Sequence, residues 1–483
     1  MTEKPPSKYG ENFSKWFDWV IEVAEIYDYG RYPVKGVGVW RPYGFKLRQL
    51  MLNIMRRLLD ETGHEEVLLP LLIPENIFRK ESEHVRGFEG EVLWVTRGGF
   101  EELDIKLALR PTSETAISYM ESFWLKSYRQ LPKKYYQVAS IFRYETKATK
   151  PMLRVREVTT FKEAHTVHES FEDAERQVKE AIEIYSKFFD ELGIPYLISK
   201  RPDWDKFAGA LYSIAFDTLL PDGRALQIGT VHHLGQTFAK VFEVRIQKRD
   251  ESIDYAWQTS YGISERVIAS IIAIHGDERG LILPPNVAPI QIVIVPIPGK
   301  DIDETSRVLK ESKKVYGDLK RSGFRVRFDD RMELRPVEKY FEWEIKGVPV
   351  RVEIGPKELA ANTITLFRRD LMGRIEVNRT KLIDEVEKLL NSITINLKER
   401  AWKWFREHIF RVSSIDEAKP IIENRQGIAE VPWCGKELCG LRMSDETGGR
   451  TLGSPINGEE PHGKSCVICG KPAITYMRIA KTY

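Results

Sequence analysis

Charged residues between positions 136 and 165 have the side chains needed to bind an anionic substrate. An apolar segment, a charged turn and a second segment with alternating charges predict a β-hairpin here. Arg143 and Glu145 lie two residues apart at the end of the first strand, so both point to one face. Arg154 and Arg156 on the second strand can join that face. A guanidinium on a rigid sheet can bind a carboxylate and a phosphate together, although the charges alone equally favour a solvated ribbon with surface ion pairs.

A second group of residues suited to chemistry lies near the end of the chain, where all four cysteines follow residue 433. Cys434 and Cys439 are separated by four residues, Cys466 and Cys469 by two, and glycines for tight turns lie nearby. Two such thiolate pairs predict a tetrahedral structural zinc site with no open position for catalysis. The alternative is four free thiols in a reducing compartment.

The elements that must position these groups are expected to alternate between helix and strand. Apolar periodicity and turn residues predict, in order, helices over 12–28 and from 45 to Gly63, strands over 67–73, 91–96 and 104–110, a helix over 168–193 and one strand over 224–236. His232 and His233 are adjacent on the last of these strands, so they are expected to point to opposite faces.

The second half of the chain begins after the Pro284-Pro285 pair, which predicts a domain boundary. Strands over 291–296, 325–329 and 350–354 alternate there with helices over 303–321 and 337–346. This alternation predicts a parallel or mixed α/β sheet. A helical pattern over 378–410 then leads to the cysteines.

Overall composition narrows the class of protein. The 74 basic and 71 acidic residues give a net charge of +3, so any nucleic-acid surface must be a local patch. No apolar run approaches the ~20 residues of a membrane span, and the first residues are too polar for a signal peptide. Four late cysteines disfavour a disulfide scaffold. We therefore expect a cytoplasmic protein of two to four domains with no membrane segment.

Three motifs resemble those of a known enzyme class. Residues 142–145 (FRYE) resemble the second signature of the class II aminoacyl-tRNA synthetases. Residues 110–114 (RPTSE) and 258–266 (QTSYGISER) resemble the prolyl-tRNA synthetases within that class, and the resemblance runs over nearly the whole chain. The interval from Glu145 to Gly262 has no room for the large editing domain of the bacterial enzymes, so the chain resembles the archaeal and eukaryotic form.

The resemblance implies an α/β multidomain fold. Its parts are a class II catalytic domain over 1–285 with an antiparallel sheet flanked by helices, a mixed or parallel α/β anticodon-binding domain over 286–380, and a C-terminal zinc-binding α/β domain over 381–483. The long helix from 45 and the strand that ends at Pro74 resemble the first class II motif, which implies a homodimer. The resemblance also places the terminal Tyr483 near the active site.

The implied reaction converts L-proline, ATP and the proline tRNA to prolyl-tRNA, AMP and pyrophosphate, with Mg²⁺. A prolinium ion needs a carboxylate and a hydroxyl near its nitrogen. The residues implied for proline are Thr112, Glu114, Arg143, Phe161, Glu163, His165 and His232. Those implied for ATP are Arg143, Glu145, Arg154, Gln227, Thr230, Ser264 and Arg266.

Arg143 and Arg266 are the implied catalytic residues. Arg143 would bridge the proline carboxylate and the α-phosphate, and Arg266 would hold the γ-phosphate. Glu353 and Lys357 are the candidates for anticodon contacts, because a carboxylate and an ammonium can bind guanine edges.

The chain departs from the family pattern at two positions. Ser260 replaces the usual first glycine of the third motif, and Val158 replaces the phenylalanine that stacks on adenine. The interval from Val158 to Glu163 is one residue longer than usual, which predicts a β-bulge. Which group covers the adenine is left open.

Two rival functions remain at the sequence level. One is another class II ligase, such as the threonyl or seryl enzyme. The other is a non-catalytic tRNA-binding relative, which the presence of both Arg143 and Arg266 disfavours. Because there is no editing insertion and smaller side chains are excluded by only ~1–3 kcal/mol per methylene, activation of cysteine or alanine is also expected.

Overall fold

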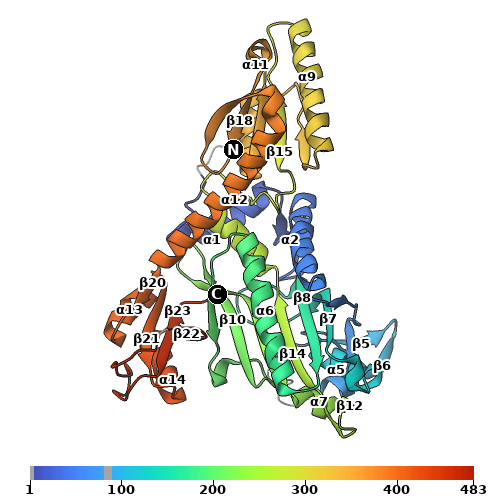
Figure 1. Cartoon of the computed structure of the whole chain (residues 1–483), viewed down its shortest axis with the longest axis vertical. Coiled ribbons are helices and arrows are strands. Elements are labelled where there is room, and N and C mark those ends of the chain that lie inside the picture. The colour runs from blue at the N-terminus through green and yellow to red at the C-terminus, as the bar shows by residue number, and fades with distance from the viewer. Residues whose placement is uncertain (1–4, 81–89, 459) are drawn as a thin grey trace.

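The computed structural model describes residues 5–80, 90–458 and 460–483 (Figure 1). Its largest sheet has the strand order β20-β21-β23-β22-β9-β10-β11-β14-β8-β7-β3. The catalytic part of this sheet is antiparallel and consists of β7 (Lys133–Phe142), β8 (Glu157–His168), β9 (Leu197–Lys200), β10 (Tyr212–Leu219), β11 (Ala225–Gly235) and β14 (Trp257–Ile263), with the short β3 (Glu65–Glu66) parallel at its end. The predicted class II architecture is confirmed.

Helices cover one face of this sheet because each presents an apolar stripe to it. They are α1 (Phe13–Val23), α2 (Pro42–Asp60), α6 (Phe171–Glu191) and α8 (Arg266–His275), and their buried residues share one core with the sheet. In Figure 1, α6 crosses in front of β10 and β14. The opposite face is left for the site. Two short strands, β1 (Tyr27–Tyr29) and β2 (Gly38–Trp40), connect α1 to α2.

A smaller three-stranded sheet flanks the catalytic sheet and contains β4 (Leu72–Pro74), β5 (Leu93–Gly98) and β6 (Glu101–Leu109). Helix α3 (Glu75–Phe78) packs against β4 and β6, and α5 (Glu114–Trp124) packs against both α3 and α7 (Thr237–Phe242). The short strands β12 (Arg245–Gln247) and β13 (Ile253–Tyr255) form a separate pair. The prediction of a strand over 67–73 is wrong for residues 67–71, because β4 begins only at Leu72. Side chains bind that backbone instead: the Leu69 N–H donates to Gln137 Oε1 at 3.0 Å, and Arg110 donates to the Leu69 carbonyl at 2.8 Å.

A second unit has its own core and matches the predicted alternation of strand and helix. The elements are β15 (Ile292–Pro296), α9 (Ile302–Arg321), β16 (Val326–Phe328), α10 (Pro336–Ile345), β17 (Val350–Ile354), α11 (Pro356–Ala361), β18 (Thr363–Arg368) and β19 (Gly373–Asn378). β15 pairs in parallel with β16 and β17, whereas β18 and β19 add antiparallel strands. The sheet is therefore mixed, as expected.

Helix α12 (Leu382–Glu407) runs diagonally in Figure 1 from the second unit to the C-terminal unit. That third unit contains β20 (Ile409–Arg411), α13 (Ile415–Glu423), β21 (Ile428–Trp433), α14 (Glu437–Thr447), β22 (Arg450–Pro455) and β23 (Thr475–Ala480). Strand β22 pairs with β9 through Ser454 and Lys200, so the C-terminal strands extend the catalytic sheet. None of the helices within the described ranges has the length and apolar character needed to cross a membrane.

Candidate active site

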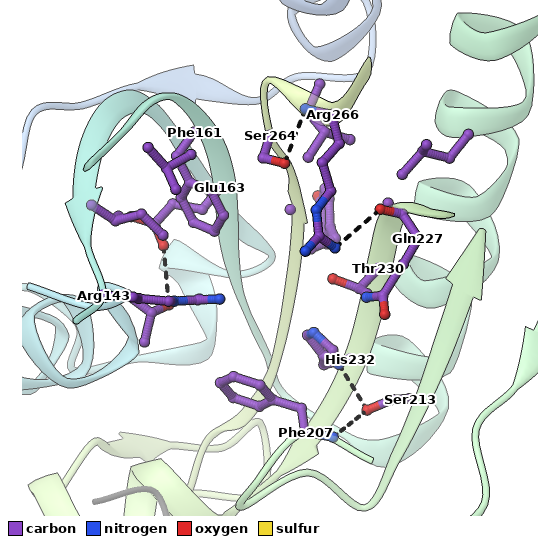
Figure 2. A pocket seen from close by; sticks show the side chains of 18 of the residues that line it. Arg143, Phe161, Glu163, Phe207, Ser213, Gln227, Thr230, His232, Ser264 and Arg266 are labelled. Atoms are coloured by element: carbon purple, nitrogen blue, oxygen red, sulfur yellow. Dashed lines mark hydrogen bonds between the residues drawn. The ribbon is translucent and has the colours of Figure 1, made fainter. Parts of the chain in front are cut away.

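A cavity of about 290 Å³ opens on the face of the catalytic sheet that the helices leave uncovered (Figure 2). It collects residues from β8, β10, β11 and β14, from the segments that follow β6 and β7, and from the C-terminal unit. Twelve of the thirteen residues implied for proline and ATP line it: Thr112, Glu114, Arg143, Glu145, Arg154, Phe161, Glu163, Gln227, Thr230, His232, Ser264 and Arg266. His165 is not among the lining residues. A second cavity of about 230 Å³ adjoins the first and shares Glu145, Arg154 and Arg266 with it.

Three of the five arginines that line this cavity are Arg143, Arg154 and Arg266. Arg143 follows β7, and its Nε donates to the Pro111 carbonyl at 3.2 Å. Arg266 is the first residue of α8 and donates to the carbonyls of Leu153 at 3.0 Å and Gln227 at 3.4 Å. Backbone carbonyls therefore aim these guanidinium groups without neutralising them.

The electrostatics of the site indicate an anionic ligand. Burial lowers the pKa of Arg266 to about 10, and the positive charges of Arg143 and Arg154 act in the same direction. Burial also lowers the pKa of Arg143, although four nearby carboxylates oppose this. Arg154 lies 3.9 Å from its nearest carboxylate oxygen, on Glu145. Like charges held together in a buried site favour a bound polyanion.

The amino-acid end of the cavity has carboxylates and a hydroxyl. Thr112 Oγ1 donates to the Glu114 carboxylate and contacts Glu163 Oε2 at 3.3 Å. Gln137 Nε2 donates to Glu163 Oε1 at 2.7 Å and the Ser113 N–H donates to Oε2 at 3.2 Å. Glu163 is thereby held in place by the fold, whereas Glu114 can face a cationic ligand.

His165 lies behind Glu163 and does not line the cavity, so the geometry does not favour its implied contact with proline. Its Nε2 is 3.6 Å from Glu163 Oε2, and both side chains are 4% exposed. Burial alone would lower the pKa of His165, but the nearby carboxylates of Glu163, Glu114 and Glu121 raise it. Burial disfavours the ionised form of Glu163, yet its partners, led by His165, lower its pKa. The two residues form a buried pair under the cavity floor.

His232 forms an apolar wall of the cavity with an aromatic partner. Its ring stacks on Phe207 with centroids 4.5 Å apart and planes 25° apart. Its Nδ1 is 2.8 Å from Ser213 Oγ, which also accepts a hydrogen bond from the Phe207 N–H at 3.0 Å (Figure 2). Burial lowers the pKa of His232 to about 4, so the imidazole is neutral at physiological pH. His233 points to the opposite face, as expected, and lies 3.8 Å from Glu175.

The hairpin differs in detail from its prediction. Strand β8 begins only at Glu157, so Arg154 and Arg156 lie in the connecting segment and not on the return strand. Arg156 leaves the cationic face, because it donates to the Glu145 carbonyl and stacks 4.0 Å from the Tyr144 ring. The predicted bulge is confirmed: the register shifts between Ala139 and Ile141, which leaves an extra residue on β8. Val158 and Phe161 on either side of it both line the cavity.

Sequence reasoning missed cavity residues that lie outside the three motifs. Those with polar or aromatic side chains are Arg201, Asp205, Lys206, Phe207, Ser213 and Arg450. Each comes from a segment with no recognisable spacing, and Arg450 comes from another unit of the chain. The one feature of the sequence that could have indicated them is the Gly-containing loop at 201–211, because loops between strands often carry binding residues.

The tail of the chain also reaches this region. Thr482 pairs with Ala225 at the start of β11, and the Tyr483 hydroxyl donates to Asp222 Oδ2 at 2.6 Å. Tyr483 lines the adjoining cavity. Tyr483 therefore lies next to the active-site cavity, as expected.

The four cysteines converge as predicted. Their Sγ atoms all lie within 4.8 Å of one another, and Cys434 Sγ is 3.7 Å from the Sγ atoms of both Cys439 and Cys469. Four sulfurs at about 2.3 Å from a tetrahedral zinc ion would be about 3.8 Å apart. The cluster could therefore hold a metal ion of that size.

The two candidate anticodon residues differ in accessibility. Glu353 is only 6% exposed and pairs with Arg351 at 2.8 Å, so in this conformation it is not presented to a ligand. Lys357 is exposed. Arg351 is itself buried between the rings of Tyr340 and Phe367. The anticodon assignment stays a prediction, with Lys357 the more accessible of the two.

Comparisons with known proteins agree with this geometry. Residues 94–275 match the family model of the class II tRNA synthetase core domain (G, H, P, S and T), residues 291–389 match the anticodon binding domain, and residues 415–483 match the C-terminal domain of prolyl-tRNA synthetase. The chain is 62% identical over 483 residues to a proline–tRNA ligase of Aeropyrum pernix and 61% identical over 477 residues to one of Sulfurisphaera tokodaii, with 99% of each chain covered. The solved structure of Giardia lamblia prolyl-tRNA synthetase in complex with prolyl-adenylate superposes with a TM-score of 0.97 at 36% identity, covering 100% of both chains.

Proposed function

The chain belongs to the proline–tRNA ligases of class II, and on this premise we propose which of its residues bind proline and ATP and how they promote the reaction. Its activity is to activate proline with ATP and to transfer the prolyl group to the proline tRNA. The observation that supports the residue assignments best is the convergence of Arg143, Arg154 and Arg266 on one cavity that also contains the carboxylate of Glu114.

Proline occupies the end of the cavity near Glu114 in this proposal. The prolinium nitrogen donates to Glu114 and Thr112, and the ring packs against Phe207 and the neutral face of His232. A neutral imidazole suits this position, because a charged one would repel the prolinium ion. Glu163 and His165 support this subsite from below as positioning residues.

ATP occupies the arginine-rich end. Glu145, Gln227, Thr230 and Ser264 offer polar atoms to the nucleotide, and Arg154 adds positive charge beside Glu145. Arg143 bridges the proline carboxylate and the α-phosphate, while Arg266 holds the γ-phosphate. The three arginines lower the repulsion between two anions that must approach to react.

The first step is an in-line displacement at the α-phosphorus. A proline carboxylate oxygen forms the new bond to phosphorus, the bond to the β-phosphate oxygen breaks, and pyrophosphate leaves toward Arg266. In the second step a ribose hydroxyl at the end of the tRNA attacks the prolyl carbonyl carbon and AMP leaves. No side-chain nucleophile is required.

Two metals complete the proposal. Mg²⁺ supplies further charge neutralisation when it is bound with the triphosphate, and Glu145 offers the kind of oxygen donor that it prefers. Zn²⁺ is held by Cys434, Cys439, Cys466 and Cys469, supported by the spacing of their sulfur atoms, and stabilises the C-terminal unit.

The domain limits that we propose are 1–285 for catalysis, 286–380 for anticodon binding and 381–483 for the zinc-binding unit. A homodimer through the region around α2 and β4 is supported by exposed apolar side chains there, Leu68 at 82% and Leu71 and Leu72 at 39% each. A cytoplasmic location fits four unpaired thiols.

The test of the arginine assignment is Arg143→Ala. ATP–pyrophosphate exchange with proline is expected to fall by at least about a thousandfold, because a donor aimed at the transition state is removed. Arg129→Ala, which removes an exposed arginine that does not line the cavity, is the matched control. Proline activation that survives in Arg143→Ala would contradict the assigned role.

Substrate selectivity follows from the small cavity and is tested by exchange with each of the twenty amino acids. Proline is expected to give the highest kcat/KM, with detectable activation of cysteine and alanine, because small apolar side chains are discriminated by only ~1–3 kcal/mol. If no cysteinyl or alanyl adenylate can be trapped, the expected misactivation is wrong. Exchange with threonine or serine but not proline would contradict the proline site itself.

A further inference from the structure

One wall of the amino-acid site is supported by the C-terminal unit. The segment 202–207 (PDWDKF) links β9 to the loop before β10 and delivers Phe207 to the cavity, where Phe207 stacks on His232. The segment has little regular structure of its own, since only Asp203–Asp205 form a short 3-10 turn. What fixes its position must therefore lie elsewhere in the molecule.

The first contact is made by Trp204, which points away from the cavity and into the C-terminal unit. Its ring lies 6.0 Å from that of Trp433 in an edge-to-face arrangement. It also lies directly over Gly440 on α14, where a Cβ atom would come within 2.4 Å of Trp204 Cη2. Gly440 follows Cys439, and Trp204 packs against the apolar cluster that contains Cys439 and Cys466. The segment therefore packs against the apolar core that also contains two of the four cysteines.

The second contact is ionic. Arg450, the first residue of β22, pairs with Asp205 of the segment and also lines the cavity. The third contact lies at the segment's base, where Arg201 Nη1 donates to the Leu452 carbonyl of β22 at 2.7 Å and Nη2 donates to Asp217 Oδ1 at 2.7 Å. Three closely spaced anchors, at 201, 204 and 205, therefore tie this segment to the C-terminal unit.

We propose that the C-terminal unit sets the position of the segment 202–207, so that Trp204, Asp205 and Arg450 are positioning residues for the proline subsite. Trp204 acts as the anchor on one side of the segment and Phe207 as the substrate-facing wall on the other. Displacement of Trp204 moves Phe207 away from His232 and loosens the pocket for the proline ring. The ATP end depends on Arg143, Arg154 and Arg266, none of which the segment contains, and is left in place. The inference rests on the proposed placement of proline beside Phe207 and His232.

The test measures the KM for proline and for ATP separately in the full-length protein. Trp204→Ala is expected to raise the KM for proline roughly tenfold, since a displacement of about 1 Å in a substrate-positioning group has effects of that order. The KM for ATP is expected to stay within about twofold. Trp204→Phe, which keeps an aromatic ring against Gly440, is expected to restore most of the affinity for proline.

Two further variants approach the same contacts from the C-terminal unit. Gly440→Ala places a methyl group against Trp204, and Arg450→Gln removes the ion pair with Asp205. Both are expected to raise the KM for proline, and Gly440→Ala is expected to keep its bound zinc, which a metal assay checks. Arg442→Gln is the matched control, because Arg442 also lies on α14 but is exposed and pairs with Glu446 on the same helix.

The inference is overturned if Trp204→Ala leaves the KM for proline unchanged, or if the KM values for proline and ATP rise in parallel with a fall in melting temperature. The second result would mean a general loss of structure and not a positioning role. A wild-type protein that fails to activate proline would instead contradict the proposed subsite, so the two failures can be told apart.

Discussion

At the scale of single residues, motif positions were predictable and the residues around them were not. Thr112, Arg143 and Arg266 line the cavity, and each lies at or near the end of a regular element whose pattern is local. Glu163 and His165 lie two residues apart on β8 and therefore share a face, as the sequence predicts. Only Glu163 lines the cavity, because the side chains packed around the strand decide which of the two reaches it. Phe207 reaches the site only through contacts with another unit, which no spacing along the chain reveals.

The buried layer under the cavity gives a pH-dependent prediction for Glu121. Burial raises the pKa of Glu121 from 4.5 to about 7, and the charge of His165 and a hydrogen bond from Gln258 oppose the rise. Between these two pH values the unfolded chain releases a proton that the folded protein keeps. The free energy of unfolding therefore falls as pH rises through this window, by up to ~3 kcal/mol.

Glu121→Gln removes this titration. The quantity to compare is the melting temperature of the variant minus that of the wild type. This difference is expected to be about 5 °C larger at pH 8 than at pH 5, because ~1 kcal/mol shifts the melting temperature by about 2 °C or less in a chain of this size. Calorimetry at both pH values measures it. Glu446→Gln on the surface of α14 is the control, and an equal difference at the two pH values would show that Glu121 does not titrate as expected.

At the scale of elements, local patterns predicted the hairpin, the β/α alternation and the cysteine knuckles. These features depend on neighbours in sequence, so a single chain reveals them. The strand expected at 67–73 failed because Gln137 and Arg110 bind its backbone groups from across the sheet. The pairing of β9 with β22 joins residues about 250 positions apart, and neither strand carries a signal for the other.

The cysteine cluster gives a prediction about the stability of the C-terminal unit. Cys439→Ser is expected to reduce bound zinc from one ion per chain to a small fraction and to cost more than about 4 kcal/mol in the stability of that unit. Atomic absorption and limited proteolysis after residue 411 measure the two effects. Leu438→Ser places the same side chain at a neighbouring position that is 71% exposed, and it should retain the metal. Full retention of zinc by Cys439→Ser would argue against the four-thiolate site.

At the scale of the whole molecule, ion pairs join the catalytic and second units, and one of them is formed by Arg369 and Asp277. Arg369, which is 1% exposed, donates to both carboxylate oxygens of Asp277 at 2.6 and 2.8 Å. Arg400 on α12 donates to the His275 carbonyl at 2.8 Å nearby. Helix α8 therefore runs from Arg266, which lines the cavity, at one end to this junction at the other.

Asp277→Asn is expected to loosen the orientation of the two units without disturbing the cavity. The substitution leaves the buried guanidinium of Arg369 without its charged partner, which costs up to about 3 kcal/mol here because Asp277 is 30% exposed and a fully buried pair costs about 3–5 kcal/mol. The KM for tRNA in aminoacylation is expected to rise roughly tenfold, because both units must contact one tRNA, while ATP–pyrophosphate exchange stays within about twofold. Asp318→Asn, which breaks a surface pair with Arg321, serves as the control. An equal loss in both reactions would mean that the junction supports the cavity itself.

The shared sheet has a consequence for attempts to divide this protein. A fragment that stops at residue 380 would keep β9 but lose β22, and the outer edge of β9 would expose unpaired N–H and C=O groups. Open edges of this kind recruit strands from other molecules, which leads to swapped dimers or insoluble aggregates. A minimal version of the enzyme would therefore have to retain β22 and β23, or replace them with a strand that blocks this edge.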